Sequence, residues 1–315
     1  MKQSLVFLVL SLAAAAGARG AADAPAPGPS PTAEAPAQPS EAEKIVQDLV
    51  ARQQALFAEA AKRDANFDEN EYRTAMQDIG NAYDDFLRKR PDYGPAYAAY
   101  GVMLGKIGMR RQSSMMLLKA DELFLRDDGK PGVRTPGFLR TWALVKNQLG
   151  NFVAEEGRPL EAVNYFLSAI DLTPNEPLYH YQLGTLLTEA RDDFLGSGHW
   201  TRAALDEAMQ RAFKRAAELA PDRIELGYRY AESFADVEKP DWDAALKAWA
   251  ALEEKAKSDF DRQAMRLQAA NILIQQKKYD EARVLIATVT VEQLQSSKQK
   301  LVAAMAETTS PAPAR

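Results

Sequence analysis

The stretch LGNFVAEEGRPLEAVNYFLSAIDLTP, residues 149–174, carries the clearest structural pattern in the chain. It combines the small residues Gly150 and Ala162 with the large Phe166 at helical spacing. A small residue lets two antiparallel helices approach closely, and a large one fills the space beside their crossing. Pro174 then ends the second helix, because its ring crowds the turn before it. The stretch therefore predicts a pair of short antiparallel helices.

The same pattern recurs along the chain. Leu149-Gly150 returns as Leu183-Gly184, 34 positions later, and such a period is typical of repeat architectures. Equivalent places are filled on both sides by Tyr97, Gly101, Ser113, Leu117, Ala120, Phe213, Ala216, Pro221, Tyr230, Ala231, Phe234, Ala245, Trp249, Ala270, Leu273, Tyr279, Ala282 and Ile286. One pair cannot bury its apolar face alone, so we expect the pairs to stack on their neighbours.

The order Leu-Gly, Ala, Phe, Ala and Pro at these spacings resembles the tetratricopeptide repeat. The resemblance covers the chain from near Tyr72 to near Val289. It implies an all-α fold, a right-handed superhelical solenoid of antiparallel helix pairs, with about six pairs over residues 41–305. A last helix, Val291 to Met305, is expected to cap the end.

Two segments break the period. Residues 126–142 and 190–200 lengthen their repeats, and each is either a recognition loop or a neutral surface insertion. Ser197 and His199 are close in sequence, but the strand-to-helix nucleophile elbow of hydrolases is absent, so no catalytic triad is predicted. The acidic pairs in the two segments lack the alternating spacing of a calcium loop, and we expect them to be solvated.

The amino-acid composition disfavours several classes of functional site. The chain has no cysteine and two histidines, which disfavours thiolate or histidine-rich metal centres, and no cofactor is predicted. Its formal charge of -5 and pI near 5.4 provide no basic field for a phosphate backbone, so nucleic acid is not an expected partner. We find no residue set arranged for catalysis, and the chain is not predicted to be an enzyme.

The two ends have the composition of export and linker segments. Residues 1–22 join a basic start to a short apolar run and small residues, the layout of a cleaved signal peptide. Residues 23–40 are rich in Pro and Ala and predict a disordered linker, and residues 306–315 predict a disordered tail. We therefore expect a periplasmic or secreted protein, with no transmembrane segment in the mature chain and no cysteine for lipid attachment.

In proteins with this repeat, the first helix of each pair lines the concave side and commonly holds the ligand. Carried over by position, this implies a partner-binding row of amides and tyrosines: Asn147, Asn151, Tyr181, Thr185, Tyr228, Glu232 and Asn271. Such side chains suit an extended peptide, although an ordinary solvated helix face would have the same composition. Asn147 stands where the carboxylate-clamp subtype has lysine, so recognition of a free C-terminal carboxylate is not predicted.

The expected function is a non-enzymatic scaffold of the cell envelope that binds a protein or peptide along the concave face. The alternative is a helical scaffold of a cell-wall-processing or glycan-binding protein. Trp200, Trp242 and Trp249 are the side chains that would contact a glycan, but Trp249 falls at the buried large position of its repeat.

Overall fold

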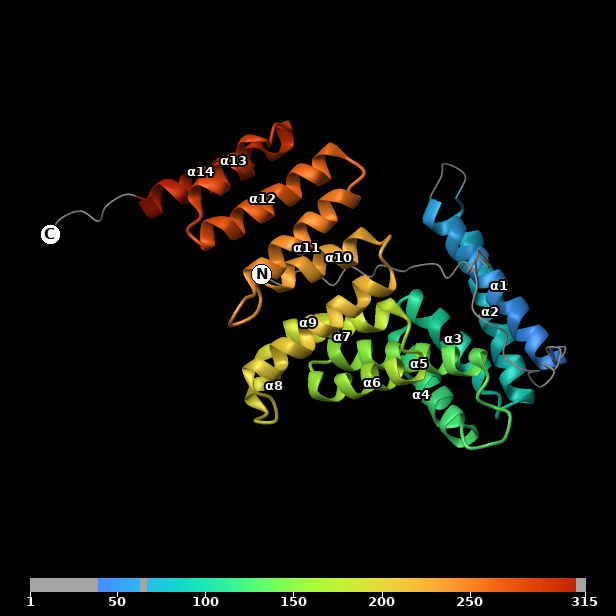
Figure 1. The fold of residues 1–315 in the computed structure, drawn as a ribbon. Helices are drawn as coiled ribbons and strands as arrows, with labels where there is room; N and C mark the ends of the chain where they lie inside the picture. The colour runs from blue at the N-terminus through green and yellow to red at the C-terminus, as the bar shows by residue number, and fades with distance from the viewer. Residues whose placement is uncertain (1–38, 63–66, 310–315) are drawn as a thin grey trace, which may run out of the picture. The chain divides into compact units, whose positions relative to one another are not determined.

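The computed structural model describes residues 39–62 and 67–309, in which there are fourteen α-helices, one short 3-10 helix and no strand (Figure 1). The predicted signal peptide, nearly all of the predicted linker and the end of the predicted tail lie outside the described residues. Among the described helices, none is both long and apolar enough to cross a membrane.

The helices follow one another as six pairs and a closing helix within the described ranges. They are α1 Glu41–Lys62 with α2 Glu69–Lys89, α3 Gly94–Lys106 with α4 Arg110–Asp127, α5 Pro136–Glu155 with α6 Pro159–Leu172, α7 Pro177–Glu189 with α9 Arg202–Leu219, α10 Ile224–Ser233 with α11 Trp242–Lys255, and α12 Asp259–Gln275 with α13 Tyr279–Ala287. The short α8 Arg191–Gly196 interrupts the fourth pair, and α14 Gln295–Thr309 follows the 3-10 turn Glu292–Leu294. Contacts join helices that are near in sequence, which confirms the predicted solenoid of helix pairs.

The repeat residues pack where the sequence pattern predicts. Gly150 faces Phe166 across α5 and α6, and a Cβ atom added to Gly150 would lie 2.8 Å from the Phe166 ring. Gly184 faces Phe213 across α7 and α9 in the same way, at 2.7 Å. Both rings are buried, as is Ala162. Glycine is therefore required at these crossings by close approach of the partner ring.

The first lengthened segment extends α4 to Asp127 and begins α5 at Pro136. Thr135 caps α5, because its side-chain oxygen accepts a hydrogen bond from the Phe138 amide at 3.2 Å. Phe138 packs edge-on against Phe124 and Trp142, so the extra turn of α5 is anchored to the core. The insertion thus adds apolar packing at the junction of α4 and α5.

The second lengthened segment forms α8 and the turn after it. Phe194 is fully buried, and Trp200 packs edge-on against it at 5.7 Å between ring centroids. Arg191 and Arg202 each donate a hydrogen bond to the Asp236 carbonyl, at 2.9 and 2.8 Å. Arg191 of this segment and Arg202, the first residue of α9, therefore hold the turn that follows α10.

Asp206 on α9 also holds the turn that follows α10. Its carboxylate accepts from the Arg202 guanidinium at 2.8 Å and from the Glu238 amide at 2.8 Å, and it is almost completely buried. Charge-assisted hydrogen bonds to a buried carboxylate are stronger than neutral ones. The turn between α10 and α11 is consequently held in place by α9.

At the C-terminal end of the described residues, α14 runs to Thr309, four residues beyond the predicted boundary at 305.

Candidate functional site

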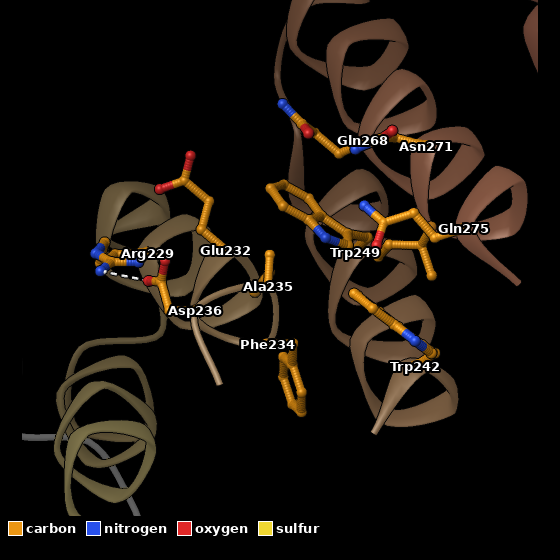
Figure 2. A pocket seen from close by; sticks show the side chains of 12 residues that line it. Arg229, Glu232, Phe234, Ala235, Asp236, Trp242, Trp249, Gln268, Asn271 and Gln275 are labelled. Carbon is orange, nitrogen blue, oxygen red and sulfur yellow. Dashed lines mark hydrogen bonds and ion pairs between the residues drawn. The ribbon is translucent and has the colours of Figure 1, made fainter. Parts of the chain in front are cut away.

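A cavity of about 350 Å³ lies among α10, α11 and α12 (Figure 2). Two first helices, α10 and α12, supply its polar sides, and α11 supplies aromatic side chains between them. It is lined by Arg229, Ala231, Glu232, Phe234, Ala235, Asp236, Trp242, Trp249, Gln268, Asn271, Ile272 and Gln275. Concave sites that combine aromatic surface with convergent polar groups are where small ligands or single side chains bind.

The α10 side of the cavity carries one ion pair and one further carboxylate. The Arg229 guanidinium donates to the Asp236 carboxylate at 2.9 Å and to the Thr188 hydroxyl at 3.3 Å, and it lies over the Phe213 ring. Glu232 makes no hydrogen bond or ion pair with any residue that the structure describes. Burial raises the pKa of Glu232 above its ordinary value; Arg229 opposes this rise and Asp236 adds to it.

The α12 side carries three amides on one face. Gln268, Asn271 and Gln275 are spaced by three and four residues, so they share one face of the helix. The Gln268 amide donates to the Tyr228 hydroxyl at 3.1 Å, and Tyr228 packs edge-on against Trp249. Burial raises the pKa of the Tyr228 phenol, Glu232 adds to this rise and the hydrogen bond from Gln268 opposes it.

The structure brings together three of the seven predicted partner-binding residues. Glu232 and Asn271 line the cavity, and Tyr228 contacts two of its lining residues, Gln268 and Trp249. Three lining residues, Gln268, Gln275 and the paired Arg229, are not among the residues predicted from the sequence. The signal that could have found the two glutamines is their spacing from Asn271, which places them on the same face of α12.

The other four predicted residues lie on α5 and α7 and do not line the cavity. Asn151 accepts from the Gln182 amide at 3.2 Å. Tyr181 packs edge-on against Phe213, and the Thr185 hydroxyl donates to the Tyr181 carbonyl at 3.0 Å. These side chains are half-buried and engaged with neighbouring residues.

Asn147 corrects one expectation directly. It is completely buried on α5, and neither its amide nitrogen nor its carbonyl oxygen has a hydrogen-bond partner among the described residues. A partner peptide cannot reach an enclosed side chain. The prediction of an accessible amide at this position is therefore wrong, because packing of the neighbouring helices covers it.

Ser197 and His199, which are close in sequence, stabilise a turn. The Ser197 hydroxyl donates to the Phe194 carbonyl at 2.7 Å and accepts from the backbone amide of His199 at 3.3 Å. The hydroxyl proton of Ser197 is thus directed at a carbonyl oxygen. Nucleophilic catalysis by serine needs this proton to be directed at a base such as an imidazole. The second insertion is in this respect a structural turn.

The acidic pairs proposed to be solvated are ion-paired or exposed. Asp127 accepts from Lys130 at 2.6 Å, and Asp128 pairs with Arg134 at 2.7 Å. Asp192 and Asp193 are exposed at a second hollow, of about 620 Å³, beside α6 and α8. Within the described ranges, no group of three or more His, Asp or Glu side chains is placed to hold a metal ion.

The tryptophans divide between core and cavity. Trp249 is buried at the crossing of its helix pair, which confirms the core position predicted for it. Its edge nevertheless lines the cavity, and half-buried Trp242 lines it as well. Trp200 packs on Phe194 outside this site.

Comparison with known proteins identifies structures of similar fold. The crystal structure of YrrB, described as a TPR protein with an unusual peptide-binding site, matches with a TM-score of 0.52 and 16% identity, over 73% of this chain and 98% of the other. PilF of Pseudomonas aeruginosa matches with a TM-score of 0.52 and 13% identity, over 84% and 99%. The Naa15/Naa10 complex bound to HypK-THB matches with a TM-score of 0.52 and 11% identity, over 85% of this chain and 34% of the other. No protein-family model and no curated protein sequence matches the chain.

Proposed function

The chain has the fold of tetratricopeptide-repeat proteins, and from this premise we propose that it is a non-enzymatic scaffold that binds an extended polypeptide. The binding surface is the face of the first helices, and the cavity among α10, α11 and α12 is its centre. The observation that carries this proposal is the set of polar groups at the cavity that have no partner within the described protein. Fold alone does not select a ligand, so the groups at this cavity determine which class of ligand fits.

The cavity has the groups that an extended peptide needs. A peptide backbone presents alternating donors and acceptors, and the side-chain amides of Asn271 and Gln275 can both donate and accept. The aromatic surface of Trp242 and the wall formed by Trp249 and Phe234 supply apolar area for a side chain. Directional bonds on one side and apolar contact on the other favour peptide binding over binding of a wholly polar solute.

The place of action is proposed to be the cell envelope, in a periplasm or outside the cell. The support is the amino-acid pattern of residues 1–22, which has the order of a cleaved signal peptide. Expression of the full chain in a bacterium, followed by fractionation and mass measurement, tests this. We expect the mature chain outside the cytoplasm, without its first residues. A cytoplasmic chain that keeps Met1 would contradict the assignment.

Peptide binding is tested by selection from a random library. Random nonapeptides displayed on phage are selected on the immobilised full chain, and the affinity of enriched peptides is measured by fluorescence anisotropy. We expect enriched sequences whose binding falls by about tenfold or more in the variant Glu232→Gln/Asn271→Ala, because loss of well-placed contacts at a binding centre costs at least that much.

The matched control is Glu254→Gln/Asn164→Ala. Both of its positions are exposed on second helices, α11 and α6, so the same chemical changes are made away from the cavity. We expect its affinity to equal that of the unchanged chain. If the library yields no binding peptide, or if both double variants lose affinity equally, the proposed peptide site is wrong.

A further inference from the structure

Glu232 is an exposed carboxylate at the cavity. It lies on the face of α10 that borders the cavity, and it makes no hydrogen bond or ion pair with the described residues (Figure 2). Its side chain is exposed, so a ligand can reach the carboxylate; partial burial raises the pKa of this carboxyl, Arg229 opposes the rise and Asp236 adds to it. A cation brought beside this accessible carboxylate can form an ion pair and a charge-assisted hydrogen bond with it.

The two other charged residues of the cavity neutralise each other. Arg229 pairs with Asp236 at 2.9 Å, and this guanidinium is also held by the Thr188 hydroxyl and the Phe213 ring. The carbonyl of Asp236 is bonded by Arg191 and Arg202, which fixes the backbone of the turn that carries this carboxylate. Arg229 is therefore not available to pair with Glu232, and the net charge of the lining residues is that of Glu232.

The opposite wall supplies hydrogen-bond acceptors and an aromatic surface. Gln268 donates through its nitrogen to Tyr228, so its amide oxygen is left to accept from a ligand, and the amide oxygens of Asn271 and Gln275 lie on the same face of α12. In the view of Figure 2, Glu232 lies on one side of the Trp249 ring and Asn271 and Gln275 lie on the other, with Gln268 above the ring. A planar cation with several donors can pair with a carboxylate, bond amide oxygens and contact an aromatic ring at once.

We propose that the cavity among α10, α11 and α12 binds a cationic side chain, preferentially arginine, of the polypeptide that lies along the first helices. This inference rests on the proposed peptide binding and specifies the chemistry that the bound segment must carry. Its size agrees, because about 350 Å³ is near the small end of the range for ligand sites. The guanidinium would pair with Glu232 and bond the amides of α12.

The test uses the same nonapeptide library on three forms of the full chain: unchanged, Glu232→Gln and Glu232→Arg. On the unchanged chain we expect one position of the enriched peptides to be arginine or lysine. On Glu232→Gln that preference disappears while peptides are still recovered. On Glu232→Arg an acidic residue replaces the basic one, because the charge of the site has been reversed.

A pair of synthetic peptides then measures the interaction. One enriched peptide is made with arginine and with citrulline, which keeps the shape of the side chain and removes the charge. We expect citrulline to weaken binding by about tenfold on the unchanged chain and on Glu254→Gln, and by less than about twofold on Glu232→Gln, as a coupled pair requires.

The outcomes separate the two proposals. If peptides are enriched without a basic position, or if citrulline binds the unchanged chain as well as arginine does, the cationic-side-chain inference is overturned and peptide binding stands. If no peptide is enriched on any form, the proposed function fails and the inference fails with it. Circular dichroism of each variant establishes that the exposed substitutions at Glu232 leave the fold intact.

Discussion

Around α5 and α7, polar side chains of the first helices are enclosed or bonded to one another: Asn147 is buried and Gln182 donates to Asn151. Around α10 and α12, equivalent first-helix positions carry Glu232 and Asn271, which border a cavity and leave their polar groups available. Repeat position thus places a side chain on the face, but its neighbours determine whether a ligand can reach it. The two regions can be perturbed separately.

The largest effect is expected where the two regions meet, at Phe213. This buried ring on α9 contacts Tyr181 and Gly184 on α7 and lies under the Arg229 guanidinium from α10. Phe213→Ala should lower the free energy of unfolding by about 3–5 kcal/mol, because it removes a large core side chain and leaves a cavity. Urea denaturation followed by circular dichroism measures it. The half-exposed Leu167→Ala is the control, with an expected loss below about 1 kcal/mol; equal losses would contradict the account.

The second largest effect is expected at Asp206, which holds the turn between α10 and α11. Asp206→Asn removes the charge that holds Arg202 and weakens the acceptor for the Glu238 amide. We expect a loss of about 2 kcal/mol in the free energy of unfolding, between the values for exposed and for fully buried ion pairs, because Arg202 is one-third exposed. Binding of a library-selected peptide should weaken as well, since the turn that carries Asp236 is released.

Glu207→Gln is the control for Asp206→Asn. Glu207 pairs with Arg211 on the exposed face of the same helix, so its loss should change the free energy of unfolding by less than about 1 kcal/mol. Peptide affinity should be unchanged in this variant. A control that weakens peptide binding as much as Asp206→Asn would show that the turn has no special role.

A smaller effect of opposite sign is expected in the enclosed region. Asn147→Leu replaces a buried amide, which has no partner among the described residues, with an apolar side chain of similar size. The substitution should stabilise the protein by about 1 kcal/mol, because it removes the desolvation cost of the amide. Asn271→Leu at the open cavity should change stability by less than about 0.5 kcal/mol. Thermal denaturation compares the two, and destabilisation by Asn147→Leu would show that its amide is satisfied in solution.

The smallest effect is a pH dependence confined to the open region. The pKa of Glu232 is raised, so this carboxylate becomes protonated at a higher pH than an ordinary glutamate does. The protonated form cannot pair with a cation. Affinity for an arginine-containing selected peptide should therefore fall as the pH is lowered through this raised pKa, and it should be regained above it. Arg229 and Asp236 also face this group, and Glu232→Gln removes its contribution. A pH profile identical in Glu232→Gln and the unchanged chain would exclude this carboxylate as the titrating group.

The helix pairs could be predicted from the sequence because their determinants are local. Gly150, Ala162 and Phe166 fill one helix crossing. Equivalent residue types recur at nearly fixed spacing, so the other pairs are expected to pack in the same way. Trp249 was placed in the core for the same reason. The insertions interrupt the spacing, and the burial of Phe194 against Trp200 could not be read from it.

The candidate site could be predicted in part. Tyr228, Glu232 and Asn271 were placed by repeat position, which sets the helix face. Enclosure of Asn147 and pairing of Arg229 with Asp236 depend on side-chain conformations and on contacts between different repeats, and repeat position contains neither. Whether a polar residue on that face is open or closed is therefore a tertiary property.

The central claim, that the polypeptide lies on the first helices at α10 and α12, is tested most directly by photo-crosslinking. A library-selected nonapeptide carrying a benzophenone residue is irradiated with the full chain, and the crosslinked residues are located by mass spectrometry. We expect crosslinks at Tyr228, Gln268, Asn271 and Gln275, which are lost when unlabelled peptide competes. Crosslinks confined to second helices, such as the exposed Met115 and Leu118 of α4, would contradict it.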